Sequence, residues 1–583
     1  MRRRQSVART TNDRIIVACV VSLSLLGLLV VRCVWLQGLE AGRYRSLGTA
    51  QYQAAATLRA TRGTIYDRFG RVLAMSVAAP SVFADPHVVL SSAEAARQLA
   101  PVVGEDRRLI EARLERGNRF AWVARQLNLE SAERVSSLRS PGVGIIEEPK
   151  RLYPQGALAS HVLGFVGVDH RGLEGLELAF NSALRGQPGW RSTLRDAKGD
   201  ALIGPWTVET LPHDGADVVL TIDSIVQAVV EDALDWGMKM YHAKGGSIVV
   251  LEPRSGDVLA MATRPGYDPR APGEAPTEAR RNRAVTDLFE PGSVFKVVTA
   301  AALLEEKRIT PDEMIDCEHG SVPTVGRHVL HDHTPYDVLS FRDVIKLSSN
   351  IGTAKAAQRL SPEELYRGIT AFGFGRPTGI EVSGEIAGLV PPPRQWSKVS
   401  MWNIPIGQGV AVTPIQLASM MAAIANGGTR VFPHVVQRIQ TPQGRVIRAT
   451  PTRTGERIIR SDTAAILQDM LTAVVESGTG RLAKVQGLTV AGKTGTAQKV
   501  EPDGHYSHSR YVASFVGFGP VPDSSFVIAV SMDEPRPAYY GGVVSAPIFQ
   551  RIVERLMSYW GAQRQMAPLL QVQHHSQTGA RVL

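Results

Sequence analysis

The chain has 583 residues, more than one hydrophobic core usually supports, so we expect at least two domains. Its hydrophobic fraction of 44% and charged fraction of 21% are ordinary for a globular protein. The net charge of +10 does not indicate a nucleic-acid partner, because Lys and Arg are spread along the chain with Asp and Glu among them.

The N-terminus predicts a membrane anchor. Five arginines precede an apolar segment, residues 15–36, which as a helix would span about 33 Å at ~1.5 Å per residue. A cleaved signal peptide is the alternative, but its apolar region would be shorter, ~7 to 15 residues, and a small-x-small cleavage site would follow. We therefore expect a cytoplasmic tail over residues 1–14, an anchor over residues 15–36, and the remainder of the chain outside the cytoplasm.

Residues 37–223 form a first exported region of short, mixed elements. Residues 62–71 predict a strand and a tight turn, with a second strand over residues 72–76. The pattern of residues 91–116 is helical and charged. No nucleophile with a neighbouring base stands out, so we interpret the region as a support or interaction module.

Residues 224–562 predict a more regular α/β domain. Strands at both ends, with helices between them, indicate an antiparallel sheet whose first and last strands meet and which helices cover. The final helix is expected to begin at Pro547, and residues 563–583 to form a mobile tail. The other predicted elements are a helix over residues 225–236 and strands over residues 246–252, 257–262, 487–492, 511–518 and 526–532.

The first motif with chemical meaning begins at Ser293. Pro291 and Gly292 break the preceding chain, and an apolar helix follows, so Ser293 is expected in its first turn. Lys296 lies on the same helix face, where its Nζ could reach Ser293 Oγ, as in an activated nucleophile. Alone, this S-x-x-K pattern is common by chance, and a solvated helix start is the alternative.

Two further motifs strengthen this interpretation. Ser348 and Asn350 form an S-x-N pattern before a glycine, at the end of a helix that Ser340 could cap. Residues 493–495 form K-T-G at the predicted end of a strand, where two glycines allow close approach of a ligand. These three motifs, in this order on one α/β segment, are the signature of the penicillin-recognising serine acyltransferases.

The chemistry requires a neutral base near the serine. Lys296 accepts the Ser293 proton only if its pKa falls from ~10.4 to ~7, which disfavours the charged form by roughly 4 to 5 kcal/mol. Burial and the nearby cation Lys493 are the expected causes.

The remaining candidate residues would bind the substrate. Lys493, with the hydroxyls of Thr494 and Thr496 and beside Gly495, suits a substrate carboxylate. The backbone N–H groups of Ser293 and Thr496 would form an oxyanion hole. Ser348 is placed to relay a proton to the leaving amine, and Asn350 to hold a substrate amide and Lys296.

The chain resembles the class B penicillin-binding proteins, the monofunctional peptidoglycan transpeptidases, most closely the division-specific FtsI type. The resemblance implies a penicillin-binding, serine β-lactamase-like transpeptidase domain on a non-catalytic pedestal of the dimerisation type, with no cofactor. Besides the anchor and the three catalytic motifs, it is carried by residues Arg62–Gly70, Gly172–Glu177, Arg281–Ala284, Gly407–Gly409 and Val412–Leu417.

The resemblance also implies a reaction and partners. A stem peptide ending in D-Ala-D-Ala would acylate Ser293 with loss of its last residue, and an amine acceptor would then take the acyl group; β-lactams would acylate the same serine. The expected place is the periplasmic side of the inner membrane at the septum, with a polytopic glycan polymerase of the FtsW type and other division proteins. Gln408 stands where many division-type relatives carry an aromatic residue, so an elongation role stays open.

Two other functions are alternatives to transpeptidation. A β-lactamase or D,D-carboxypeptidase would hydrolyse the acyl-enzyme, but class A β-lactamases add a glutamate for the deacylating water, and residues 363–366 resemble a capped helix start instead. A non-enzymatic β-lactam sensor or scaffold would usually need a larger cytoplasmic or multi-span portion than the short basic tail.

A cysteine and several histidines lie close together in the sequence, which could suggest a metal site. No C-x-x-C or H-E-x-x-H spacing supports one, so we predict a polar loop near the cleft and no metal. Cys19 and Cys33 fall in the anchor, which leaves no intramolecular disulfide partner outside it. The residues of the loop are Cys317, His319, His328, His331 and His333.

Overall fold

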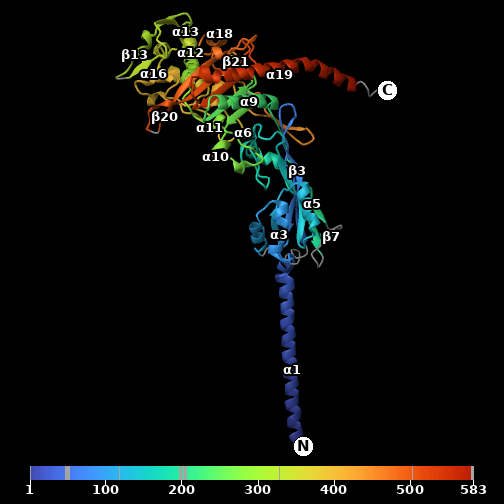
Figure 1. The fold of residues 1–583 in the computed structure, drawn as a ribbon. Coiled ribbons are helices and arrows are strands. Elements are labelled where there is room, and N and C mark those ends of the chain that lie inside the picture. Colours follow the sequence, from blue (N-terminus) through green and yellow to red (C-terminus); the bar gives the residue numbers. More distant parts are fainter. Residues whose placement is uncertain are drawn as a thin grey trace. The chain divides into compact units, whose positions relative to one another are not determined.

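The computed structural model describes residues 2–45, 53–116, 119–195, 201–202, 207–326, 328–452, 454–501 and 503–578 (Figure 1). They divide into two compact units. The first is Met1–Ala60 with Gly186–Asp214, and the second is Thr61–Arg185 with Gly215–Leu583.

The first unit contains the anchor. Helix α1 (Arg2–Val34) continues into a π-helical turn, η1 (Trp35–Leu39). Within them, Asn12–Leu39 is long and apolar enough to cross a bilayer, with a mean hydropathy of 2.6, in agreement with the predicted segment 15–36. The unit also holds a small antiparallel sheet, in which the strand β6 pairs with the three others. Its strands are β1 (Gln53–Leu58), β6 (Gly189–Arg195), β7 (Ala201–Leu202) and β8 (Val208–Thr210).

The second unit begins with most of the predicted pedestal. The predicted strand, turn and strand are present, with Gly70 at φ +82° in the turn, a conformation that favours glycine. Buried Leu99, Ile110 and Leu114 hold two helices against this region. The elements are β2 (Ile65–Tyr66), β3 (Val72–Ala84), α3 (Ser92–Val103), α4 (Arg107–Leu114), β4 (Ala121–Ala124), α5 (Leu129–Ser137), β5 (Val143–Leu152), α6 (Ser160–Leu163), α7 (Gly175–Ala179) and α8 (Asn181–Leu184).

A buried charge cluster ties these elements together. The side chain of Glu177 on α7 is fully buried between two arginines. Its Oε2 accepts a hydrogen bond of 2.7 Å from Arg62 Nε, and its Oε1 accepts one of 2.7 Å from Arg151 Nε on β5. The sequence segments Arg62–Gly70 and Gly172–Glu177, far apart along the chain, therefore meet through this carboxylate.

One seven-stranded sheet links the pedestal to the catalytic region. Its strand order is β18-β17-β9-β2-β3-β4, and β5 also pairs with β3. Strands β17 (Val436–Gln440) and β18 (Val446–Ala449) come from the middle of the predicted catalytic domain, and β9 (Asp217–Leu220) precedes it. Strand β9 pairs in parallel with β2 and antiparallel with β17. The sequence pattern did not predict this shared sheet.

The catalytic region is built on a five-stranded antiparallel sheet of order β11-β10-β22-β21-β20. The predicted meeting of first and last strands is confirmed, because β10 pairs with β22. The prediction of a strand over residues 487–492 was wrong. Gly487, at φ +74°, forms a turn, and β20 begins only at Ala491, so K-T-G lies near the start of its strand. The strands are β10 (Gly245–Leu251), β11 (Val258–Arg264), β20 (Ala491–Val500), β21 (Tyr506–Gly519) and β22 (Phe526–Asp533).

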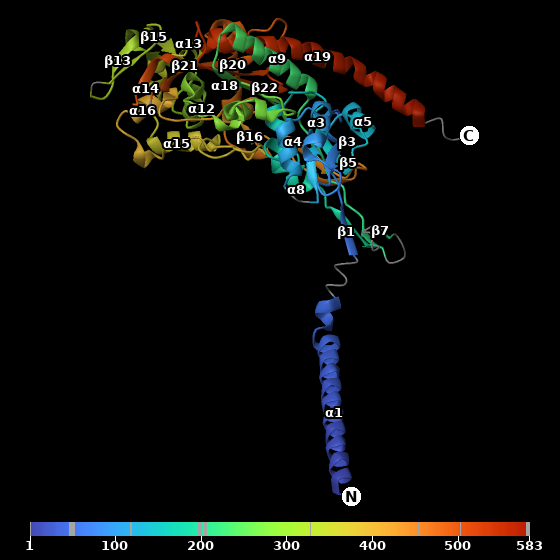
Figure 2. The same ribbon diagram turned by 60° about the horizontal axis from the view of Figure 1, so that its bottom comes forward.

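Helices cover both faces of this sheet. Helices α9 (Ser224–Met240) and α19 (Gly541–Thr578) lie side by side on one face (Figure 2). Helices α12 (Lys296–Glu305) and α17 (Pro414–Ala425) pack in the core on the other. Alternate residues of β10 and β22 belong to the two cores, as expected for a sheet buried on both sides.

Helix α19 begins six residues before the predicted Pro547. The Gly541 N–H donates to Thr496 Oγ1, and a Cβ at Gly541 would lie 2.2 Å from Gly495 O, so a close contact with β20 fixes this start. The side chains of α19 are described to Gly561. The predicted mobile tail, residues 563–583, therefore lies outside the described side chains.

Further elements complete the second unit. The helices are α10 (Thr277–Arg280), α11 (Arg283–Thr286), α13 (Phe341–Leu347), α14 (Asn350–Ala357), α15 (Pro362–Ala371), α16 (Ser400–Asn403) and α18 (Ser461–Ser477). The short strands are β12 (Met314–Asp316), β13 (Ser321–Pro323), β14 (Val329–His331), β15 (Val338–Ser340), β16 (Thr429–Val431) and β19 (Thr454–Arg457).

Candidate active site

Ser293 lies on a short 3₁₀ turn, η3 (Gly292–Phe295), which leads directly into α12. Two glycines allow this turn to pack against β20. Gly292 has φ +51°, and a Cβ there would lie 3.1 Å from Thr496 O. A Cβ at Gly495 would lie 2.9 Å from Val294 Cγ2 and 2.3 Å from Ser514 Oγ. Close backbone contact between η3 and β20 therefore depends on glycine at both positions.

The S-x-N segment connects two helices. Helix α13 carries the predicted cap, since the Ser340 side chain accepts from the Asp343 N–H. Ser348 ends this helix in the left-handed region, at φ 62° and ψ 39°. Asn350 was expected at the same helix end, but it is the first residue of α14, which the side chain of Ser349 caps. The left-handed residue turns the chain so that Ser348 and Asn350 face the same cavity.

Lys296 is fully buried at the start of α12. Its Nζ donates to Ser348 O at 2.6 Å and to Asn350 Oδ1 at 2.7 Å, and lies 3.3 Å from Ser348 Oγ. Burial lowers the pKa of Lys296 to about 7, and the negative charge of Asp332 acts in the opposite direction. The hydroxyl of Ser293 has no hydrogen-bond partner within the described part of the chain, so its contact with Lys296 stays a prediction.

Lys493 is a second fully buried cation, on β20. Its Nζ lies 2.9 Å from Ser348 Oγ and 3.3 Å from Thr494 O. Burial holds the pKa of Lys493 well below its usual value, and repulsion from Lys296 lowers it further. Ser348 Oγ thus lies between the amino groups of two lysines, and because repulsion between their charged forms is mutual, the charged form of either disfavours that of the other.

The motif residues line one cavity of about 670 Å³. Ser293, Ser348 and Asn350 lie on its wall with Thr494 and Thr496 from β20; Gln408 lines it as well. The Thr494 and Thr479 hydroxyls are 2.8 Å apart. The fold brings together the residues to which the sequence assigns roles in catalysis and substrate binding. They are Ser293, Lys296, Ser348, Asn350, Lys493, Thr494, Gly495 and Thr496. The Ser293 and Thr496 N–H groups belong to segments that meet where η3 packs against β20, and their role as an oxyanion hole stays a prediction.

Sequence reasoning missed Asp332, which organises the S-x-N segment. Its carboxylate accepts hydrogen bonds from Ser349 Oγ at 2.6 Å, from the Asn350 N–H, and from the Ile351 N–H at 3.1 Å. A single side chain therefore fixes the start of α14 and carries a negative charge near Lys296. The only signal in the sequence was an acidic residue inside the histidine-rich loop.

The residues of that loop are dispersed among other contacts. Cys317 is buried beside Ser349 Oγ, and His331 O accepts from Asn350 Nδ2. His333 Nε2 lies 2.6 Å from Tyr540 Oη and lines the cavity. Within the described residues, no three His, Cys, Asp or Glu side chains are grouped in a way that could hold a metal ion. His319 and His328 contact Asp337 and Thr324, respectively.

Comparison with known proteins gives two family matches. Residues 246–554 match the penicillin binding protein transpeptidase domain, and residues 57–220 match the penicillin-binding protein dimerisation domain. Among curated proteins, the chain is 34% identical over 552 residues to the probable peptidoglycan D,D-transpeptidase PenA of Neisseria meningitidis, covering 93% of this chain and 92% of PenA. It is 32% identical over 562 residues to the peptidoglycan D,D-transpeptidase FtsI of Escherichia coli, covering 95% and 92%.

Solved structures agree with these matches. Penicillin-binding protein 3 of Mycobacterium tuberculosis, in complex with aztreonam, is 30% identical, with a TM-score of 0.68, covering 87% of this chain and 97% of that one. The dimerisation and transpeptidase matches follow each other in the order that the sequence predicted for pedestal and catalytic domain. The chain therefore belongs to the class B penicillin-binding proteins, a family of serine acyltransferases with a transpeptidase domain.

Proposed function

We propose that this protein is a peptidoglycan D,D-transpeptidase that cross-links stem peptides through an acyl-enzyme on Ser293. The observation that carries this proposal is the cavity that gathers Ser293, the S-x-N residues and the K-T-G strand above two buried lysines. Around both lysine ammonium groups, the described hydrogen bonds run to hydroxyl, amide and carbonyl oxygens and to no carboxylate. This environment favours a neutral amine that accepts a proton.

In the first half-reaction, Ser293 Oγ attacks the carbonyl carbon of the penultimate D-Ala. Neutral Lys296 takes the hydroxyl proton, and the oxyanion receives hydrogen bonds from the Ser293 and Thr496 N–H groups. As the peptide bond breaks, Ser348 passes a proton to the leaving D-Ala amine, so that an ester and a free amino acid form. In the second half-reaction, an acceptor amine attacks the ester, loses a proton, and Ser293 regains its own.

The substrate carboxylate completes the electrostatics of the site. Lys493 and the Thr494 and Thr496 hydroxyls would bind the carboxylate of the last D-Ala. A negative charge beside Lys493 favours its ammonium form, and that ammonium in turn disfavours charge on Lys296. Substrate binding would therefore place the proton on Lys493 and leave Lys296 ready to act as base.

We further propose a septal role in cell division. The similarity to FtsI over 95% of this chain supports it, while Gln408 at the cavity wall keeps an elongation role as the alternative. The proposal includes a division of the chain into four parts. They are a cytoplasmic tail (residues 1–14), an anchor (15–36), a pedestal (37–223) and a catalytic domain (224–562). In this proposal, the catalytic domain lies on the periplasmic side of the inner membrane, and a polytopic glycan polymerase of the FtsW type and other division proteins are its partners.

Intact-mass measurement tests the acyl-enzyme. The full chain in detergent is mixed with penicillin, alongside Ser293→Ala. We expect a stable adduct of one penicillin on the wild type and none on the variant; rapid loss of the adduct would favour a hydrolase, and no adduct at all would contradict an acylating serine. A cross-linking assay with a stem-peptide donor and an amine acceptor then measures transfer. Imaging a fluorescent fusion during depletion separates the cell roles, because septal localisation with filaments supports division, and lateral localisation with rounded cells supports elongation.

A further inference from the structure

The catalytic cavity carries a charged side chain at each end. At one end, Glu290 Oε1 accepts from the Gly409 N–H at 2.7 Å and from Tyr506 Oη at 3.1 Å. At the other end, Arg481 begins a short 3₁₀ turn, η7 (Arg481–Ala483). Neither Glu290 nor Arg481 forms an ion pair within the described residues. The cavity thus has an acidic end and a basic end.

The two ends are far apart along β20. At the acidic end, Tyr506 is paired with Val500, the last residue of this strand. At the basic end, the Thr479 hydroxyl lies 2.8 Å from the Thr494 hydroxyl, near the start of the strand. Thr494 and Val500 are six residues apart, about 20 Å in a strand. The turn η3, which carries the nucleophile, packs against the strand between them, at Gly495.

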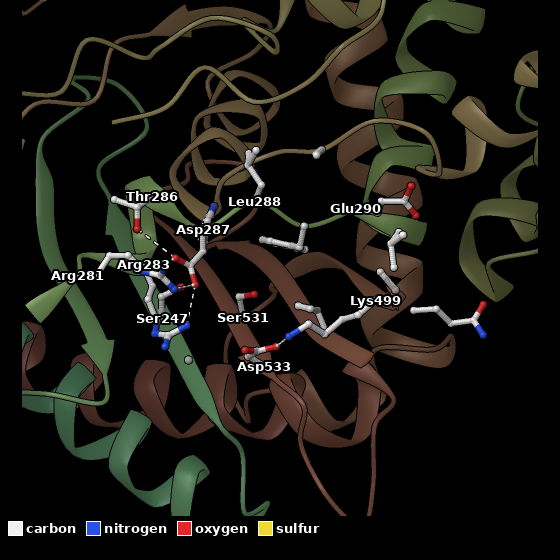
Figure 3. Close-up of a pocket in the computed structure, with 18 residues that line it drawn as sticks. Ser247, Arg281, Arg283, Thr286, Asp287, Leu288, Glu290, Lys499, Ser531 and Asp533 are labelled. Carbon is white, nitrogen blue, oxygen red and sulfur yellow. Dashed lines mark hydrogen bonds and ion pairs between the residues drawn. The ribbon is translucent and has the colours of Figure 1, made fainter. Parts of the chain in front are cut away.

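The charges in the neighbouring cavity are paired, as Figure 3 shows. This cavity, of about 450 Å³, has Glu290 in common with the catalytic cavity. Asp287 lies 2.8 Å from Arg283, and Asp533 lies 2.8 Å from Lys499. In the figure, Glu290 lies apart from both pairs. Within the described lining of the two cavities, the guanidinium left without a carboxylate is therefore the one at the basic end.

Three segments of the chain meet at the basic end. They are the turn after α18, the start of β20 and the start of α19. A Cβ at Gly542 would lie 2.3 Å from Thr479 O and 3.4 Å from Thr494 Cγ2, so these segments are in direct contact. Arg481 follows two residues after Thr479, and η7 also packs against α19. The fold therefore fixes the backbone of Arg481 at the cavity wall.

The surface of the basic end suits a peptide. Arg481 is exposed, and its guanidinium has no hydrogen-bond partner within the part of the chain that the structure describes. Two apolar side chains also line this end, and Leu482 is 50% exposed and Val543 is 44% exposed. A guanidinium binds a carboxylate through two parallel hydrogen bonds, and exposed apolar side chains in a cavity indicate a ligand.

The proposed reaction gives the two ends different substrates. The last D-Ala carboxylate of the donor would bind at Lys493 and Thr494. Since the turn with the nucleophile packs beyond Thr494, at Gly495, the donor chain before the scissile bond extends along β20 toward the acidic end. The basic end lies past the departing D-Ala, on the side that the donor leaves empty.

The acceptor amine should enter where the D-Ala amine departs, because attack is the reverse of that departure. The amine nitrogen forms a bond to the ester carbonyl carbon, the bond from that carbon to Ser293 Oγ breaks, and one proton of the amine ends on this oxygen. Ser348, which gives a proton to the leaving amine, takes one from the entering amine. The rest of the acceptor then extends away from the acyl-enzyme, toward the basic end.

We propose that the basic end of the catalytic cavity is the acceptor subsite, in which Arg481 binds a carboxylate of the amine-bearing acceptor peptide. Leu482 and Val543 contact the apolar part of the same peptide. The subsite thereby holds the acceptor amine toward the acyl-enzyme on Ser293. This inference rests on the proposed function, since it names where the second substrate of that reaction binds.

Transfer kinetics with two acceptors test the subsite. Both acceptors are the same short peptide with one free amine, and its carboxylates are free in one and amidated in the other. The full chain in detergent receives a saturating D-Ala-D-Ala donor peptide, and the cross-linked product is measured against acceptor concentration. For the wild type we expect a KM about tenfold lower for the free-carboxylate acceptor, as for one charge-assisted hydrogen-bonded contact.

The variants locate the effect. In Arg481→Gln, the ratio of the two KM values should fall from about ten to below about two, while Arg481→Lys should retain part of the preference. Leu482→Ser should raise KM for both acceptors, by about threefold. The matched control is Arg445→Gln, an exposed arginine between β17 and β18 that forms no ion pair within the described residues, and it should keep the tenfold ratio.

Hydroxylamine, a small amine without a carboxylate, separates acceptor binding from other effects. If Arg481→Gln loses transfer to hydroxylamine as strongly as transfer to the free-carboxylate peptide, the residue acts on the donor or the fold, and the inference is wrong. Equal KM values for the two peptides in the wild type, or a tenfold ratio that persists in Arg481→Gln, would also overturn it. Each of these results leaves the proposed function standing, because cross-linked product still forms in the wild type.

A failure of the proposed function would look different. The wild type would release D-Ala from the donor but form no cross-linked product with either peptide or with hydroxylamine. That result would contradict transpeptidation itself, and the inference with it.

Discussion

Glu177 in the pedestal and Lys296 in the catalytic domain are both ionisable side chains removed from water. Glu177 is held between the guanidinium groups of Arg62 and Arg151, each at 2.7 Å. Lys296 meets only neutral oxygen atoms at hydrogen-bond distance, and its nearest like-charged neighbour is Lys493, across Ser348. In one region a buried carboxylate has two guanidinium partners at hydrogen-bond distance, and in the other two buried lysine amino groups share one hydroxyl and meet no carboxylate within the described residues.

The comparison distinguishes a buried charge that stabilises the fold, Glu177, from a buried lysine whose lowered pKa suits it to catalysis, Lys296. A compensated buried charge is fixed in one protonation state and fastens distant segments of chain. A buried lysine without a counter-ion gives up its proton near neutral pH, which is the property that a base for Ser293 needs. Substitutions in the two regions should therefore affect different quantities.

Removing the base should have the largest effect. Lys296→Met is expected to slow penicillin acylation of Ser293 by roughly 10³-fold, since a positioned base contributes about 10²- to 10⁴-fold. Its Tm should not fall, because methionine has a similar length and needs no counter-ion. Stopped-flow acylation with a fluorescent penicillin and a thermal melt check both. An acylation rate within tenfold of wild type would exclude Lys296 as the base.

Breaking the compensated cluster should act on stability. Glu177→Gln leaves two buried guanidinium groups without a carboxylate, and we expect the free energy of unfolding of the second unit to fall by about 3 kcal/mol. Penicillin acylation per folded molecule should remain at the wild-type rate. The control Glu94→Gln removes an exposed partner of Arg97 in the same pedestal, and should leave Tm unchanged. Equal melts for the two variants would contradict the comparison.

Removing the second cation should shift the pH profile. Acylation needs neutral Lys296, so its rate should rise with pH through about 7. Lys493→Ala removes an amine whose charged form disfavours charge on Lys296, so we expect the pKa of Lys296 to rise and the rising limb to move to higher pH. The midpoint of the limb, taken from acylation rates between pH 5 and 10, is the readout, independent of the lower overall rate. A profile identical to that of the wild type would show that the two lysines are not coupled.

Removing the negative neighbour should shift the profile the other way, by a smaller amount. Asp332 raises the pKa of Lys296, so Asp332→Asn should lower that pKa and move the rising limb to lower pH. Asparagine retains an oxygen that can accept from the Asn350 and Ile351 N–H groups, so the start of α14 is expected to persist. Asp523→Asn, at an exposed carboxylate on a distant turn, is the control and should leave the midpoint in place.

Motifs with fixed local spacing were predictable. Ser293 and Lys296 are separated by one helical turn, and the Ser340 cap lies three residues before Asp343, so both follow from chain-local rules. The family signature then predicted that the S-x-N and K-T-G motifs lie in the same site as Ser293. The predicted bounds of β20 and α19 were wrong because the ends of these elements depend on contacts between residues distant in sequence. Helix α19 begins at Gly541 because the Gly541 N–H donates to Thr496 Oγ1 on β20.

Other features had no local signal. Asp332 acts through the N–H groups of a helix start 18 residues away, and nothing in its own segment indicates this. Arg281 and Arg283 belong to a segment that carried the family resemblance, yet the cavity that they line is also lined by β20 and β22, which lie far along the chain from them. The seven-stranded sheet was missed because β17 looks like any other short strand and its partner β9 lies about 220 residues earlier.

That shared sheet determines where the chain can be cut. A shortened protein that begins at residue 224 would lack β9, and the hydrogen bonds from Thr221 Oγ1 to Val258 O and His434 O would be lost with it. Strand β17 would then present an unpaired, partly apolar edge, the kind of surface through which sheets of separate molecules join. We therefore expect a catalytic domain that begins at residue 224 to aggregate, and the smallest stable fragment to retain β2, β3 and β9.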